Sequence, residues 1–273
     1  GIMFPKTIRH LKGEDLKDAI PDKLYIPLTD IRMLTKVDLL MLEMLANCNW
    51  ERPLYLAISV GSVSKLKFDN YFVQEGLAFR FTPFDYKKWG DVGENRLYAV
   101  DVERLYDNVM NRYKYGGLDT PGLYLDETTL RTCWYHRRLF AQLAKELIAQ
   151  GDNERAKKVL AYAEQVIPGY NVPETHESGS YDIATAYATL GEKTKAVTLA
   201  VHLIAEAEDY INWAFSLKGN RIEMVRNDCI YKFWQWNQYN ELLKKIDGEK
   251  YKESNRQFEE KYALFAPTMS YKN

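Results

Sequence analysis

The apolar residues follow two different patterns along the chain, and the change between them falls near residue 120. Before that point, apolar runs of strand length at 23–28, 54–59 and 77–84 alternate with segments of helical spacing. This order predicts a three-stranded sheet with covering helices. After it the spacing is helical almost throughout. The sequence therefore predicts a mainly α protein with a small α/β part, made of an α/β subdomain over 1–120 and a helical subdomain over 121–273.

Three segments of the first part are predicted as helices, at 36–47, 69–76 and 101–115. Thr35 and Asp38 precede the first with the spacing of a capping box, in which Asp replaces the usual Glu. Glycines end the other two helices, as expected where a helix must turn. The first strand run contains a proline, which places it at the edge of the sheet.

The second part repeats one frame of residues. Gly151 and Gly191 stand in predicted turns 40 positions apart, and Ala156 and Ala196 follow them at equal distances. These small residues let two helices approach closely, in the pattern of a tetratricopeptide repeat, whose standard period is about 34 residues. A weaker third unit has its matching residues at Phe233, Asn237, Tyr239, Leu242 and Ile246. Because one helix pair cannot bury its own apolar face, we expect stacked antiparallel pairs over 127–265.

The residues Trp50 to Pro53 stand directly before the second strand run. In a structural interpretation, proline is tolerated at the first residue of a strand and favours extended geometry before it, while Trp50 covers the end of the sheet. In a functional interpretation, Trp50 and Arg52 belong to a binding site. The structural interpretation explains the stretch by itself, and both residues are kept as binding candidates.

Two further groups of side chains are binding candidates. Arg137 interrupts an apolar stripe on the helix predicted after Asp126, and Arg138 lies beside it. The favoured interpretation is a buried Arg137 paired with a carboxylate from the first part, and the alternative is an anion site for a glycan or a lipid phosphate. In the segment 231–239, five aromatic residues lie close together, and helical spacing leaves Trp234 on the exposed side. Core packing is the favoured role of this segment, with stacking on a sugar or a peptide as the alternative.

Charge and composition argue against several classes of function. The net charge is −1 at pH 7, without the basic excess expected for binding nucleic acid or an anionic membrane. The three cysteines are far apart, and no zinc, Rossmann or P-loop motif is present. His176 and Glu177, with Asp182 nearby, could be metal ligands, but a solvated polar loop is the favoured interpretation. We predict no metal, no cofactor and no catalytic residue in this chain.

Four segments together resemble a known family: NWERPLYLA at 49–57, YFVQEGLAFRFTP at 71–83, YDNVMNRYKYGGLDTPGLYLDE at 106–127 and LIAQGDNERAKKVL at 147–160. They are similar to the soluble C-terminal region of Bacteroidota membrane proteins in the protein O-mannosyltransferase-like group, within the C-type glycosyltransferase superfamily. In such proteins the acidic catalytic residues are expected in the membrane part. The resemblance therefore transfers no catalytic residue to this chain.

The resemblance implies a non-catalytic accessory domain of a membrane glycosyltransferase, on the periplasmic side of the inner membrane. Its partner would be an acceptor polypeptide or another protein, with a glycan as a further candidate ligand. The chain begins without Met, and we expect it to be a piece of a larger protein that reaches the membrane only through a region N-terminal to it. The alternative is a free-standing glycan-binding protein or carbohydrate-active enzyme.

Overall fold

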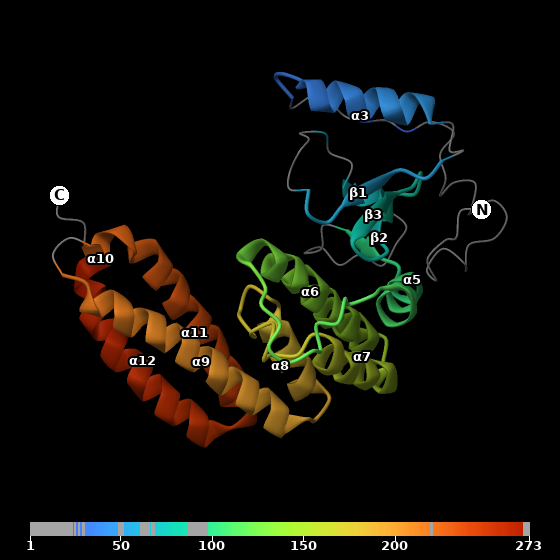
Figure 1. Cartoon of the computed structure of the whole chain (residues 1–273). Helices are drawn as coiled ribbons and strands as arrows, with labels where there is room; N and C mark the ends of the chain where they lie inside the picture. The colour runs from blue at the N-terminus through green and yellow to red at the C-terminus, as the bar shows by residue number, and fades with distance from the viewer. Residues whose placement is uncertain are drawn as a thin grey trace. The chain divides into compact units, whose positions relative to one another are not determined.

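The computed structural model describes residues 24, 26, 28, 31–48, 52–60, 66, 69–86, 98–218 and 221–269. The chain divides into two compact units, Gly1–Lys114 and Tyr115–Asn273 (Figure 1). The first unit holds a small four-stranded sheet and the second is helical, which confirms a mainly α protein with a small α/β part. No helix in the described part of the chain is long and apolar enough to cross a bilayer.

Helix α3, Lys36–Asn47, begins at the capping box that the sequence predicts. The backbone N–H of Asp38 donates to Thr35 Oγ1 over 3.3 Å, and the backbone N–H of Thr35 donates to Asp38 Oδ2 over 2.7 Å. Asp38 is fully buried, so these bonds stabilise a carboxylate that is costly to bury unpaired. Met41 and Leu45 of the same helix pack against the core of the sheet.

The four strands are β1 Tyr55–Ala57, β2 Phe72–Gln74, β3 Ala78–Phe81 and β4 Ala99–Val100. Their spatial order is β1-β3-β2-β4, in which β3 is antiparallel to both β1 and β2, and β4 is parallel to β2. Phe72 pairs with Phe81, and Tyr55 pairs with Arg80. Because successive side chains point to opposite faces, Phe72 and Phe81 share one face and Tyr55 and Arg80 share the other.

Two details of the strands differ from the prediction. β4 is a fourth strand where the sequence predicts three. Leu24, Ile26 and Leu28, the described residues of the predicted edge strand, lie outside any strand. Leu24 and Ile26 instead pack against the aromatic core of the sheet. At Leu24 and Ile26 the apolar pattern therefore reflects partial burial without strand pairing.

The helix predicted over 69–76 is also different. It is a 3₁₀ turn, Asp69–Tyr71, followed directly by β2. Phe72 and Val73 are buried and pair with β3. Burial and pairing in the sheet therefore outweigh the weak helical pattern of this short segment.

Helix α5, Val102–Asp107, continues as a π-helix, Asn108–Arg112, and ends before the extended Tyr113. This confirms the helix predicted from residue 101, with an end at Arg112. Asp101 is its N-cap and accepts from the backbone N–H of Arg104 over 3.1 Å. The cap fixes the start of the helix directly after β4.

The second unit consists of α6 Glu127–Ala149, α7 Asn153–Val166, α8 Ser180–Thr189, α9 Lys193–Ser216, α10 Arg221–Met224, α11 Arg226–Ile246 and α12 Gly248–Met269. Gly151 lies in the turn between α6 and α7 and Gly191 in the turn between α8 and α9, with φ of 78° and 81°. In both turns the next residue donates back to the preceding helix, from Asp152 to Leu147 over 2.8 Å and from Glu192 to Tyr187 over 2.9 Å. This geometry ends a helix and reverses the chain, so the predicted helix pairs with glycine turns are present.

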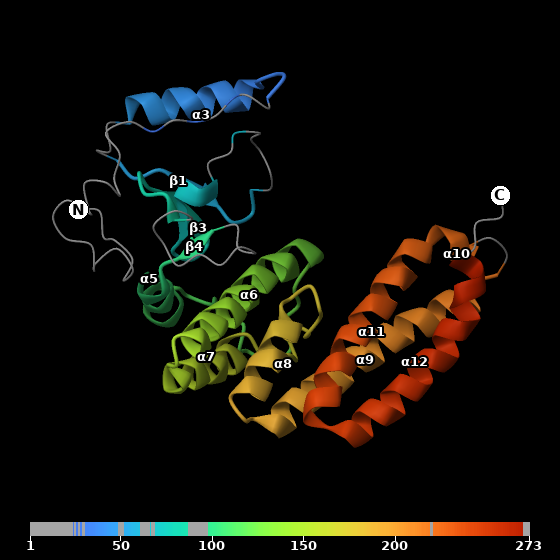
Figure 2. The same ribbon diagram turned by 180° about the vertical axis from the view of Figure 1, so that it is seen from behind.

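Helices α9, α11 and α12 pack side by side, as both Figure 1 and Figure 2 show. Phe233, Trp236 and Tyr239 of α11 are buried in their common core, as the sequence predicts. Trp236 Nε1 donates to Ser254 Oγ over 2.8 Å, and Ser254 Oγ donates to Asn240 Oδ1 over 2.6 Å. Trp236, Ser254 and the amide oxygen of Asn240 are thus joined in one chain of hydrogen bonds.

Candidate functional site

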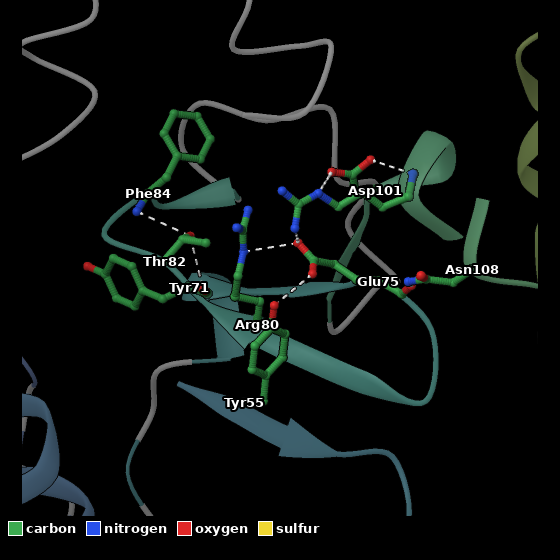
Figure 3. Close-up of polar contacts among 9 residues, drawn as sticks. Tyr55, Tyr71, Glu75, Arg80, Thr82, Phe84, Asp101 and Asn108 are labelled. Atoms are coloured by element: carbon green, nitrogen blue, oxygen red, sulfur yellow. Dashed lines mark hydrogen bonds and ion pairs between the residues drawn. The ribbon is translucent and has the colours of Figure 1, made fainter. Parts of the chain in front are cut away.

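The carboxylate of Glu75 is the centre of a polar network in the first unit (Figure 3). Its Oε1 atom lies 3.0 Å from Arg80 Nε and 2.8 Å from Arg104 Nη1. Its Oε2 atom accepts from the hydroxyl group of Tyr55 over 3.1 Å. Since Tyr55 belongs to β1, Arg80 to β3 and Arg104 to α5, one carboxylate joins three elements.

The short link between β2 and β3 positions this carboxylate. The backbone N–H of Glu75 donates to Ala78 O over 3.1 Å, which closes the hairpin. Asn108 Nδ2 donates to Glu75 O over 2.7 Å. Tyr113 accepts from the N–H of Leu77 over 3.0 Å. Asn108, in the helix that follows β4, and Tyr113, directly after that helix, therefore hold the hairpin at Glu75 and Leu77.

Gly76 has a structural role in the same link. Its φ is 155°, and a Cβ atom at this position would overlap the hydroxyl group of Tyr113. Only glycine lets the backbone approach that hydroxyl group so closely. Gly76 in the QEGLAFRF segment is therefore needed by the turn that presents Glu75.

The charged side chains of this network are largely buried, which strengthens the attraction between them. The side chains of Glu75 and Arg80 are each 8% exposed, and the side chain of Arg104 is 25% exposed. Arg104 Nε also lies 3.8 Å from Asp101 Oδ2. Partial burial, and then the charge of Glu75, raise the pKa of the Tyr55 hydroxyl group, so Tyr55 stays protonated and remains a donor.

A cavity of about 420 Å³ lies against this network. Its lining is entirely polar or aromatic and comprises Tyr55, Glu75, Asp101, Glu103, Arg104, Asp107, Asn108 and Arg112. The volume is within the range of small-molecule sites, about 300–1,000 Å³. We call it the polar cavity.

Of the binding candidates in the first unit, Trp50 lies outside the described residues. Arg52 is exposed, in a bend shortly before β1. Pro53 lies outside the strand, two residues before β1 begins at Tyr55. Arg52 is not among the residues that line the polar cavity.

Arg137 is buried, but its partners differ from the prediction. Nη2 donates to Ile167 O over 3.0 Å and also to Val172 O, while Nη1 donates to Pro173 O over 2.7 Å and to Ser178 Oγ over 3.2 Å. The expected carboxylate from the first part is replaced by oxygen atoms of the segment between α7 and α8. The carbonyl groups of that segment turn inward and need donors, which the five N–H groups of a guanidinium supply. Burial lowers the pKa of Arg137, and Glu174 partly offsets this effect.

The segment between α7 and α8, residues 167–179, also brings the other two candidates together. Arg138 Nε donates to Glu177 O over 2.5 Å. Gln235 Nε2, next to Trp234 on α11, donates to Glu177 Oε1 over 2.9 Å. Trp234 is 48% exposed, as the helical spacing predicts. Arg137, Arg138 and the α11 surface thus meet at one connecting segment.

His176 belongs to an aromatic cluster in this segment. Its ring centroid lies 5.3 Å from that of Trp234, and Trp234 stacks on Tyr231 at 5.6 Å with an interplanar angle of 11°. His176 Nδ1 lies 2.8 Å from the buried hydroxyl group of Tyr239. Burial lowers the pKa of His176, which favours the neutral ring. In the described part of the chain no three His, Cys, Asp or Glu side chains are grouped to hold a metal ion.

A second cavity, about 320 Å³, lies between α7, α8 and α9. We call it the helical groove. Leu160, Ala163 and Leu199 are among its apolar residues. Glu164 lines it too and accepts from Tyr187 Oη over 2.5 Å and from Lys195 Nζ over 2.8 Å. Apolar surface beside paired charges suits an extended polypeptide better than a single small apolar ligand.

The sequence candidates do not include Tyr55, Glu75, Asp101, Arg104 or Asn108. One signal was available for Glu75: it is a charged residue directly before glycine, inside a run whose other residues are mostly apolar or aromatic. Arg80 stands between Phe79 and Phe81, so strand alternation places it on the face opposite the aromatic core. The site depends on the contact between α5 and this face of the sheet. Nothing in the sequence indicates that contact.

A family model matches the first part of the chain. No curated protein and no solved structure matches the chain. Residues 7–103, which include Tyr55, Glu75, Arg80 and Asp101, match the family model of the TMEM260-associated domain 2, a domain linked to TMEM260, a candidate protein O-mannosyltransferase.

Proposed function

We propose that this chain is a non-catalytic accessory domain of a membrane glycosyltransferase of the protein O-mannosyltransferase-like group. It would lie on the extracytoplasmic, periplasmic side of the membrane and bind an acceptor polypeptide or a partner protein. The observation that carries the proposal is the match of residues 7–103 to a TMEM260-associated domain. The resemblance of four segments of the chain to the soluble region of such transferases also supports it, and two of these segments, 106–127 and 147–160, lie beyond the matched residues.

The helical unit supports the binding role. Its hairpins α6–α7 and α8–α9 share one turn geometry, and we interpret them as tetratricopeptide-like repeats. The helical groove between them combines apolar residues with the Glu164–Lys195 pair. An extended peptide can place an apolar side chain on the apolar residues and hydrogen-bond its backbone to the charged rim.

The charged side chains at both cavities support a non-catalytic role. Arg137 already donates hydrogen bonds to oxygen atoms of the segment between α7 and α8. Glu75 is already paired with two guanidinium groups. A general acid or base must reach a reacting group in the right protonation state, and these side chains are held in structural contacts instead.

Peptide binding by the whole chain tests this proposal. Fluorescence anisotropy would measure the affinity for labelled Ser/Thr-rich peptides with one central apolar residue. Thr198 lies on the exposed side of α9 and lines the helical groove, so Thr198→Arg should fill the groove and weaken binding. Val201 lies on the same helix, is 39% exposed and is not among the groove residues, so Val201→Arg is the matched control. Equal effects of the two substitutions would contradict a site in the groove.

A second assay addresses the non-catalytic part of the proposal. The chain is incubated with a lipid-linked mannose donor and the same peptides, and sugar transfer is followed by mass spectrometry. We expect no transfer. Sugar transfer by the chain alone would overturn the accessory role. In a parallel incubation with simple glycosides, hydrolysis would favour a carbohydrate-active enzyme.

A further inference from the structure

We propose that the polar cavity of the first unit binds a neutral pyranose sugar. This site is separate from the peptide site proposed in the helical groove, and either can fail without the other. The proposal rests on the composition of the cavity, on a fixed aromatic ring at its wall and on unused hydrogen-bonding atoms.

The residues that line the polar cavity disfavour most other classes of ligand. The lining contains no aliphatic side chain, so an apolar ligand has no surface on which to bury its area. Four carboxylates and two guanidinium groups line the cavity, and this net negative charge disfavours phosphorylated and sulfated ligands. Three of the carboxylates, Glu75, Asp101 and Asp107, already lie within ion-pair distance of a guanidinium group, so they offer little uncompensated charge to a cation. A neutral ligand rich in hydroxyl groups remains.

Tyr55 supplies a flat apolar surface at the wall of the cavity. Tyr55 is 51% exposed, and the hydrogen bond from its hydroxyl group to Glu75 holds the end of the ring in place at the cavity wall. One face of a pyranose ring carries C–H groups of weak positive charge, which pack on the negative face of an aromatic ring. A ring that is fixed before the ligand arrives loses little conformational entropy on binding.

Arg104 and Asn108 supply hydrogen bonds in addition. Arg104 uses Nη1 for Glu75, and its Nη2 has no hydrogen-bond partner in the described part of the chain. Asn108 uses Nδ2 for Glu75 O, and among the described residues its Oδ1 has no partner. The guanidinium of Arg104 offers N–H donors in one plane, and Oδ1 of Asn108 is a nearby acceptor. Together they match two adjacent hydroxyl groups of a sugar, because each hydroxyl group can both donate and accept a hydrogen bond. Glu75 and Asp101 hold Arg104 in place, so the donors are preorganised.

Chemical-shift mapping of the whole ¹⁵N-labelled chain tests the proposal. The probes are methyl α-D-mannopyranoside, a short threonine peptide carrying one mannose, and the same peptide without sugar. We expect both sugar probes to bind in the millimolar range and to shift the amide signals of residues 55, 75–77 and 101–108. Equal shifts with the bare peptide or with an oligolysine peptide at these amides would overturn the proposal. Absence of shifts, or shifts confined to Tyr231 and Trp234, would also overturn it.

Two variants identify the groups that bind the sugar. Tyr55→Ala removes the stacking surface and should raise Kd at least about tenfold. Arg104→Lys keeps the charge beside Glu75 but loses the planar donor pair, and should raise Kd severalfold. Tyr124→Ala is the matched control, because Tyr124 is 88% exposed and belongs to the other unit. If Tyr55→Ala fails to fold, saturation-transfer difference spectra of the unmodified chain replace it. The C–H protons of one sugar face should then receive most of the saturation, and uniform saturation would contradict the stacking.

Discussion

Arg137 Nη2 donates to the carbonyl oxygen of Ile167 over 3.0 Å, at the residue where α7 ends. The same guanidinium donates to two further carbonyl groups and one hydroxyl group. A single side chain therefore supplies the hydrogen-bond donors for several oxygen atoms between α7 and α8. A residue that interrupts an apolar stripe in the sequence is therefore a structural part of the fold.

Arg137→Met should destabilise the protein by about 3–4 kcal/mol, because several buried oxygen atoms lose their donor at once. Urea unfolding followed by circular dichroism measures the change in the free energy of unfolding. Arg138→Met is the control on the same helix, since Arg138 is exposed and donates a single hydrogen bond to Glu177 O. Equal losses for the two variants would show that the buried bonds do not stabilise the turn.

Glu75→Gln should destabilise the first unit by about 3–5 kcal/mol, because it removes the buried carboxylate charge that lies 3.0 Å from Nε of the buried Arg80. Asp107→Asn removes a carboxylate from the exposed pair with Arg112 and should have a much smaller effect. Hydrogen exchange at the amides of β2 and β3 measures the local change directly. Unchanged protection of these amides in Glu75→Gln would contradict a structural role for the pair.

The sequence predicts much of the helical unit because its signals are local. The spacing from Gly151 to Ala156 and from Gly191 to Ala196 places turns and helices where the structure has them. Helical periodicity likewise separates the exposed Trp234 from the buried Trp236. Each of these features depends on residues within one or two turns of a helix.

The polar network could not be predicted in the same way, because its contacts are distant in sequence. Glu75 meets Tyr55 across 20 positions and Arg104 across 29. Arg137 illustrates the same limit, since periodicity predicts its burial but not its carbonyl partners 30 to 36 positions away. A short apolar run such as 69–76 is ambiguous for a related reason, since pairing with a distant strand decides its structure.

Gly76→Ala should destabilise the protein by about 2–3 kcal/mol, through backbone strain at positive φ and overlap with the hydroxyl group of Tyr113. Tyr113→Phe removes that hydroxyl group, so the cost of Gly76→Ala should be smaller in the Tyr113→Phe background. A double-mutant cycle in urea measures this coupling. Gly122→Ala is the control for backbone strain alone, because Gly122 has a φ of 79° and no atom within 4 Å of its Cβ position, and it should cost about 1 kcal/mol. Additive effects of Gly76→Ala and Tyr113→Phe would contradict the overlap.

The stability of the protein should fall as the pH is lowered below about 6.5, the usual pKa of histidine. Burial lowers the pKa of both His136 and His176 in the folded protein. Between the lowered folded pKa and the unfolded value of 6.5, the unfolded chain binds more protons, so the free energy of unfolding rises with pH. The contribution of these histidines to the free energy of unfolding is fully present above pH 6.5. It is lost as the pH falls through the folded pKa. Glu206, whose pKa burial raises, acts in the opposite sense between 4.5 and its folded pKa, because there the folded protein binds the extra proton.

The variant His176→Gln separates these effects. Glutamine is neutral throughout and can still accept from Tyr239, so the fall in stability between pH 7.5 and pH 5.5 should be smaller than in the unmodified protein. His136 continues to titrate in this variant, so part of the pH dependence should remain. His202→Gln is the matched control, since His202 is exposed on α9. The measurement is the free energy of urea unfolding at each pH. If His176→Gln and the unmodified protein lose equal stability on acidification, burial does not hold His176 neutral in the folded protein.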